Sequence, residues 1–122
     1  MFSRKRLYKS FCDAGRGLRD VFKSEQNFRL QVFAAAVVVV LLIVLPLHNW
    51  ERIVLILLMV MVLSMELLNS AMERLSDMLK PRLSPYIRMI KDIMAAAVLV
   101  TSLGALTVGI LICWPYLVSF LK

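Results

Sequence analysis

The sequence predicts an all-α membrane protein in which an N-terminal amphipathic surface helix precedes three transmembrane helices. Of its 122 residues, 61% are hydrophobic, which is more than a soluble domain of this size can cover with polar surface. These residues are gathered in long blocks, and a bilayer core requires roughly 20 mostly apolar residues per helix. The Lys and Arg residues fall almost entirely outside the blocks. We expect one membrane domain over residues 1–122.

The first element is a basic helix over residues 4–24. Its apolar residues recur at helical spacing with basic residues between them, a pattern typical of a helix that lies in the membrane interface. They are Leu7, Phe11, Ala14, Leu18, Val21 and Phe22. We expect that the apolar block that follows, residues 32–47, is not a cleaved signal, because its basic leader is too long and no small-residue cleavage site follows it. The chain should turn into the first span near residues 24–28.

Three spans are predicted over 29–48, 52–72 and 93–119. Residues 32–47, 53–65 and 93–121 carry no charge. The helix of the second span should continue to about residue 79, until the prolines at 81 and 85 interrupt it. Residues 73–92 therefore form a segment outside the bilayer, with helix resuming near residue 86.

Charge placement predicts the orientation. Residues 1–29 hold eight Lys or Arg and residues 73–92 hold five, whereas the 48–52 loop and the C-terminal tail hold one each. The positive-inside rule places the first two segments in the cytoplasm, with the protein in the inner membrane. The net charge of +7 then requires no nucleic-acid partner. Cys12 and Cys113 should lie on opposite sides, so we expect no disulfide.

A stripe of small residues, four apart, runs along the third span. Its members are Ala97, Thr101, Ala105 and Gly109. Such stripes let helices approach closely in lipid, and we expect this face to pack within or between protomers.

Polar residues at the end of the second span are the main candidates for chemistry. Glu66, Asn69 and Glu73 share one helix face by their i, i+3, i+7 spacing, and Asp77 extends that face. A carboxylate in the bilayer is costly and usually has a task. Carboxylate and amide oxygens suit Mg²⁺ together with a phosphate ligand. The alternative is a helix end with solvated charges, which fits Glu73 and Asp77 well but fits Glu66 poorly.

Two further charged sites are expected at the same depth. Glu25 lies where the surface helix meets the first span, and Lys91 and Asp92 lie where the third span begins. Each alone is typical of a helix end. Together they bring carboxylates and a lysine to the cytoplasmic interface, where the lysine could pair with nucleotide phosphates.

These motifs together resemble the small prokaryotic integral-membrane diacylglycerol kinase and undecaprenol kinase family. Residues 66–73, ELLNSAME, are similar to the family pattern E-[IL]-L-N-[ST]-A-I-E. Lys91-Asp92 followed by AAAVL at 95–99, Glu25 before Asn27-Phe28-Arg29, and Gly17-Leu18 also fit. The resemblance runs from about Arg6 to Trp114.

The resemblance implies a homotrimer with shared sites that transfers the γ-phosphoryl group of ATP to a membrane-lipid hydroxyl. By position, Glu66 is implied to be catalytic and to contact the lipid, and Glu25 and Glu73 to bind Mg²⁺ and nucleotide. Further nucleotide contacts are implied for four residues: Arg6, Asn69, Lys91 and Asp92. Residues 80–87, KPRLSPYI, depart from the acidic or His-containing hinge of many relatives. The resemblance therefore assigns no residues of this segment to the adenine pocket.

Two other functions remain possible from the residues alone. A non-enzymatic membrane assembly subunit would not need Glu25, Asn69, Glu73 and Lys91 to converge. A small transporter would place its glutamate nearer the middle of the bilayer and usually has more spans. The pattern EQNFR at 25–29 is somewhat more similar to the polyprenol kinases, but the residues do not identify the lipid substrate.

Overall fold

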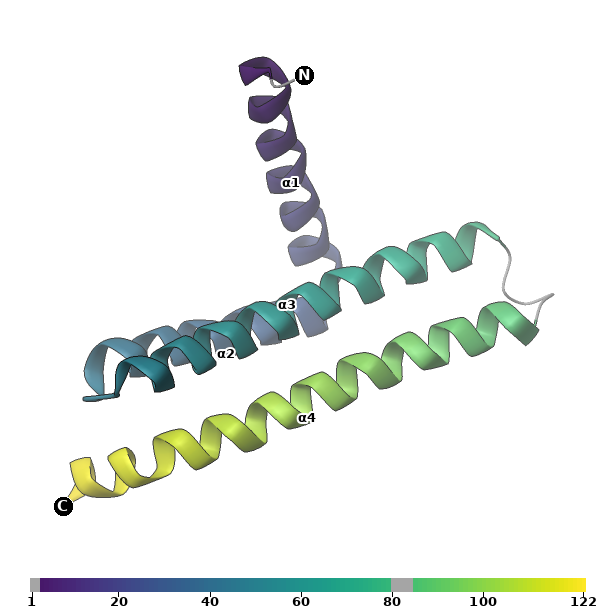
Figure 1. Ribbon diagram of the computed structural model, residues 1–122. Helices are drawn as coiled ribbons and strands as arrows, with labels where there is room; N and C mark the ends of the chain where they lie inside the picture. Colours follow the sequence, from purple (N-terminus) through teal and green to yellow (C-terminus); the bar gives the residue numbers. More distant parts are fainter. Residues whose placement is uncertain (1–2, 80–84) are drawn as a thin grey trace.

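The computed structural model describes residues 3–79 and 85–122, which form four α-helices. These are α1 (Arg4–Ser24), α2 (Gln26–Val44), α3 (Asn49–Met78) and α4 (Pro85–Leu121). Helices α2, α3 and α4 run alongside one another, whereas α1 projects away from them (Figure 1). The last three are each long and apolar enough to cross a membrane. The predicted all-α class and the three long apolar helices are confirmed.

Helix α1 covers the same residues as the surface helix expected from the sequence, and a sharp turn at Glu25 separates it from α2. Glu25 has extended backbone angles (φ −113°, ψ 113°), and α2 begins at the next residue. The Arg29 guanidinium donates to the carbonyls of Phe22 and Lys23, at 2.8 and 2.9 Å. It therefore satisfies carbonyls that the end of α1 leaves without helical partners.

Prolines lie at two further helix boundaries. Helix α2 ends at Val44, and Leu45 is extended (φ −84°, ψ 144°) because the residue before Pro46 disfavours the helical region. Residues 45–48, which the sequence analysis included in the first span, thus connect α2 to α3. Helix α4 begins at Pro85, a favoured residue for the first turn. The break expected at residue 81 lies outside the described residues.

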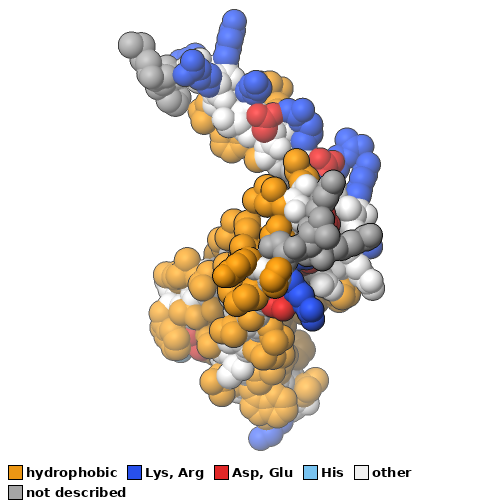
Figure 2. All heavy atoms as spheres, turned by 90° about the vertical axis from the view of Figure 1, so that its right-hand side faces the viewer, with side chains coloured by type: hydrophobic (Ala, Val, Ile, Leu, Met, Phe, Trp, Pro, Cys, Tyr) orange, Lys and Arg blue, Asp and Glu red, His pale blue; other side chains and the backbone are white. Residues whose placement is uncertain are grey.

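The buried core lies where α2 ends, α3 begins and α4 approaches its C-terminus. It consists of Leu45, Leu47, Leu55, Ile112 and Cys113. Helices α3 and α4 form the most extensive helix pair. Most apolar side chains elsewhere on α2, α3 and α4 are exposed. Figure 2 shows this hydrophobic surface, with charged side chains gathered over α1 and near the ends of α3 and α4 that face the viewer.

An apolar cavity of about 460 Å³ lies between α2, α3 and α4. The polar side chains in its lining include Gln31 and Ser102, and the Gln31 amide donates to the Ser102 hydroxyl at 3.4 Å. Ala105 and Gly109 of the small-residue stripe line it as well. A Cβ atom built on Gly109 would meet nothing within 4 Å. Within the described protomer, the stripe therefore does not bring helices into close approach at Gly109.

Candidate functional site

The polar face of α3 is buried at its centre. Glu66 is 3% exposed and Ser70 is 1% exposed, and both continue the buried row of Leu55 and Val62 by helical spacing. Burying a carboxylate in an apolar helix is unfavourable unless a partner or a task compensates for it. Sequence reasoning did not single out Ser70, although its position one turn after Glu66 is the signal that would have found it.

An unsatisfied amide oxygen lies on the same face. Asn69 Oδ1 is buried and accepts no hydrogen bond from the part of the chain that the structure describes. Buried polar atoms normally have a partner, so an acceptor without one indicates that a donor or a cation belongs beside it. Such an atom is compatible with a site for an Mg²⁺–phosphate group.

Glu25 and Glu73 lie within electrostatic range of Glu66. Glu25 comes from the α1–α2 turn and Glu73 from α3, two turns beyond Glu66. The three carboxylates named in the sequence analysis thus lie in the same region of the protomer. Among residues 3–79 and 85–122, no three His, Cys, Asp or Glu side chains are grouped closely enough to hold a metal ion by themselves. A metal ion bound here would need further oxygen ligands from water and phosphates, which Mg²⁺ commonly has.

A hydrogen bond that does not involve the carboxylates joins the α1–α2 turn to α3. Arg74 donates to the Ser24 hydroxyl at 2.7 Å. Ser24 directly precedes Glu25, and Arg74 directly follows Glu73. This bond therefore holds the two acidic residues near each other. The sequence analysis missed it, because a contact between residues 50 positions apart leaves no spacing signal.

Helix α4 reaches the site through Lys91. Its Nζ lies 3.1 Å from Asp77 Oδ1, and the two side chains are 33% and 66% exposed. Asp77 follows Glu73 by one helical turn, so Lys91 lies at the same end of α3 as the carboxylates. Exposed ion pairs contribute little to stability, about 0–1 kcal/mol, so Lys91 can exchange Asp77 for another anion at low cost. Asp92 is exposed on α4.

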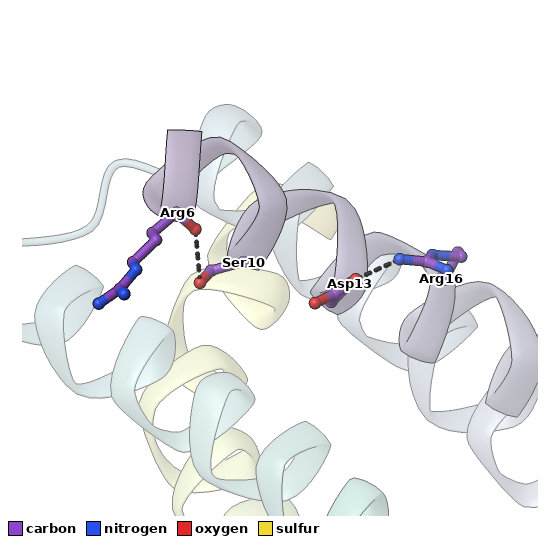
Figure 3. A network of polar contacts seen from close by, with 4 residues as sticks. All are labelled: Arg6, Ser10, Asp13 and Arg16. Carbon is purple, nitrogen blue, oxygen red and sulfur yellow. Dashed lines mark hydrogen bonds and ion pairs between the residues drawn. The ribbon is translucent and has the colours of Figure 1, made fainter. Parts of the chain in front are cut away.

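Arg6 is not brought to this group within the protomer. It lies 19 residues before Glu25 (25 − 6), which corresponds to about 28 Å along a helix. Its backbone carbonyl accepts from the Ser10 hydroxyl at 3.0 Å, and its side chain extends away from the neighbouring Asp13–Arg16 ion pair (Figure 3). Because α1 projects from the other helices (Figure 1), Arg6 is separated from Glu66.

Comparisons with known proteins identify the family of the chain. The family described as prokaryotic diacylglycerol kinase matches residues 12–113. An undecaprenol kinase of Bacillus subtilis (strain 168) is 34% identical over 112 residues, covering 92% of this chain and 91% of the relative. A diacylglycerol kinase of Synechocystis sp. (strain ATCC 27184 / PCC 6803 / Kazusa) is 31% identical over 116 residues, covering 94% of this chain and 66% of the relative. The resemblance stated from the motifs is confirmed: the chain belongs to the prokaryotic diacylglycerol kinase family and is a lipid kinase of the membrane.

Proposed function

We propose that this lipid kinase transfers the γ-phosphoryl group of ATP to the hydroxyl of undecaprenol or diacylglycerol, with Glu66 as the general base. The observation that carries the proposal is the burial of Glu66, 3% exposed within a helix apolar enough to span the membrane. A carboxylate at that position can meet a hydroxyl group whose lipid never leaves the bilayer. Solvated helix-end charges, the alternative reading, do not account for such burial.

In the proposed reaction, Glu66 accepts the hydroxyl proton as the lipid oxygen attacks the γ-phosphorus. The new O–P bond forms as the bond to the β-phosphate oxygen breaks, and ADP leaves with the electron pair. Phosphoryl transfer depends mainly on positioning and on charge stabilisation. A base within hydrogen-bond reach of the hydroxyl adds about 10²–10⁴ in rate.

Glu25 and Glu73 are the proposed ligands of an Mg²⁺–nucleotide complex. When bound, Mg²⁺ would neutralise the phosphate charge that the carboxylates would otherwise repel. The Arg74–Ser24 hydrogen bond supports this assignment, because it holds the turn containing Glu25 beside Glu73. The unpartnered Oδ1 of Asn69 supports a position for Asn69 next to the reacting group.

The remaining nucleotide contacts are proposed for Lys91, Asp92 and Arg6. Lys91 would exchange its exposed bond with Asp77 for a nucleotide phosphate. Arg6 is about 28 Å along α1 from Glu25, which supports a role at the site of a neighbouring protomer. A homotrimer with sites shared between protomers accommodates that arrangement.

The proposed orientation places the N-terminus in the cytoplasm and the protein in the inner membrane, with α1 on the membrane surface. The sharp turn at Glu25 supports this, because it directs α1 away from the spans. Leu7, Phe11, Leu18 and Phe22 are between 43% and 70% exposed on α1. An amphipathic helix with exposed apolar residues and many basic residues binds an anionic lipid surface.

The test is phosphorylation of each lipid by the purified protein in mixed micelles with Mg-ATP. Undecaprenol is the first substrate to try, since the undecaprenol kinase relative matches over 91% of its own length. Phosphate transfer to either lipid supports the proposal, and a preference names the substrate. Absence of transfer to both, by protein that is folded and oligomeric, would contradict it.

A further inference from the structure

A second buried carboxylate lies at the opposite end of α3 from the candidate site. Glu51 is 7% exposed, and its Oε1 accepts hydrogen bonds from the Tyr116 hydroxyl of α4 and from the His48 backbone N–H, the latter at 2.9 Å. A buried carboxylate left without partners would be strongly unfavourable. The Tyr116 bond therefore links the start of α3 to the last turns of α4, and the His48 bond caps the first turn of α3. The sequence analysis treated residues 48–52, which include Glu51, only as a short loop between two spans.

The Glu51–Tyr116 bond and the Lys91–Asp77 ion pair link the same two helices at opposite ends. On α3 the two contacts are 26 residues apart (77 − 51), and on α4 they are 25 apart (116 − 91). At a rise of 1.5 Å per residue these separations are about 39 and 38 Å. The two contacts thus agree on one axial register for the antiparallel pair.

Part of the interface between the two ends is loosely packed. Ala105 and Gly109 line the cavity of about 460 Å³, and nothing lies within 4 Å of a Cβ built on Gly109. The buried apolar cluster lies at the Glu51 end, and Val62 is buried between the two ends. Small side chains beside open space do not interlock, so the polar contacts at the ends add resistance to sliding.

We propose that Glu51 and Tyr116 are positioning residues for phosphoryl transfer. From the far end of the helix pair, they hold α4 in the register that places Lys91 beside the Glu66–Glu73 face. A slip of one residue would move Lys91 by about 1.5 Å relative to that face. This inference rests on the proposed function, because it gives Lys91 and Glu73 their tasks.

The first test does not depend on kinase activity. Cys113 is 6% exposed in the core beside Tyr116, whereas Cys12 is exposed on α1. Tyr116→Phe and Glu51→Ala should increase maleimide labelling of Cys113 relative to Cys12 at least about threefold, while Glu51→Gln, which keeps an acceptor oxygen, should stay near wild type. Tyr8→Phe, which removes an exposed hydroxyl on α1, is the matched control. Unchanged Cys113 labelling in both disruptive variants would overturn the proposal.

The second test measures coupling between the two ends. Tyr116→Phe and Asp77→Ala are made singly and together, and the KM for ATP is measured separately from kcat. If two sites this far apart are uncoupled, the effects of their substitutions on the KM for ATP should multiply to within roughly twofold. If both contacts maintain the same register, the combined effect of the double variant should exceed the product of the two single effects by about threefold or more. Most of this excess should appear in KM.

A simple product of the single effects would refute the shared register. In the control pair, Tyr8→Phe with Asp77→Ala, the effects should multiply. A wild-type protein that phosphorylates no lipid would instead refute the proposed function. In that outcome the Cys113 labelling still decides whether Glu51 and Tyr116 hold α4.

Discussion

The Arg74–Ser24 hydrogen bond provides a sharp test of how the site is assembled. It joins the turn that carries Glu25 to the α3 face that carries Glu73, at a distance of 2.7 Å. Neither Arg74 nor Ser24 is proposed to touch the substrates. Arg74→Met removes the donors but keeps the apolar stem, so it should loosen the two carboxylates without removing either.

The size of the effect follows from the contact. An intramolecular hydrogen bond contributes about 0.5–1.5 kcal/mol net, and 1.4 kcal/mol is tenfold in an equilibrium constant. Because this bond is exposed, we expect an increase of about threefold in the KM for Mg-ATP, near the lower end of the range. The kcat should change little, because the bond is made equally in the ground state and in the transition state.

Steady-state kinetics of three variants provides the measurement. Ser24→Ala should reproduce the effect of Arg74→Met, and the double variant should be no worse than either, because all three remove one interaction. Arg19→Met, which removes an exposed guanidinium from α1, is the control. An unchanged KM in both single variants, or fully multiplicative effects in the double variant, would refute the reasoning.

The remaining predictions concern the ligands and the topology. Glu73→Gln and Glu25→Gln should each raise the Mg²⁺ concentration required for half-maximal activity while preserving the oligomer; unaltered Mg²⁺ dependence in both would show that the ligands are misassigned. Lys91→Met should weaken ATP use through KM, and an unchanged KM would argue against its phosphate contact. For the topology test, single cysteines replace Asn49 or Met78 in a cysteine-free background. A membrane-impermeant thiol reagent applied outside should label the Cys at position 49 but not the one at position 78. Met78 is 79% exposed, so a Cys there is accessible from the cytoplasmic side. Labelling of both would contradict the proposed orientation.

Much of the helical architecture could be predicted from the sequence, because composition and periodicity act locally. The uncharged blocks identified three helices of spanning length, and the i, i+3, i+7 pattern placed Glu66 and Glu73 on one face. Helix ends were less accessible. The first span was predicted to reach residue 48, but Pro46 ends α2 at Val44, since apolarity continues through residues that cannot be helical.

The contacts between helices could not be predicted in the same way. Glu51 with Tyr116 and Ser24 with Arg74 are pairs 65 and 50 residues apart, and neither produces a periodic signal. The sequence analysis did not single out Glu51, whose carboxylate accepts a hydrogen bond from Tyr116 of α4. The spacing of Gly109 indicated close packing within or between protomers, and within the protomer it lines a cavity.

The most direct test of the central claim is the turnover of Glu66→Gln, measured per folded oligomer beside its melting temperature. Gln preserves the size of the side chain but cannot accept the lipid proton, and a general base is worth about 10²–10⁴ in rate. Removing a buried charge should not lower stability, because Glu66 is 3% exposed in an apolar helix. We predict a protein that binds nucleotide, melts no lower than wild type and has lost at least about 99% of lipid phosphorylation. Retention of more than about a tenth of wild-type turnover would contradict the assignment, because a loss of less than tenfold is smaller than the smallest effect expected of a general base.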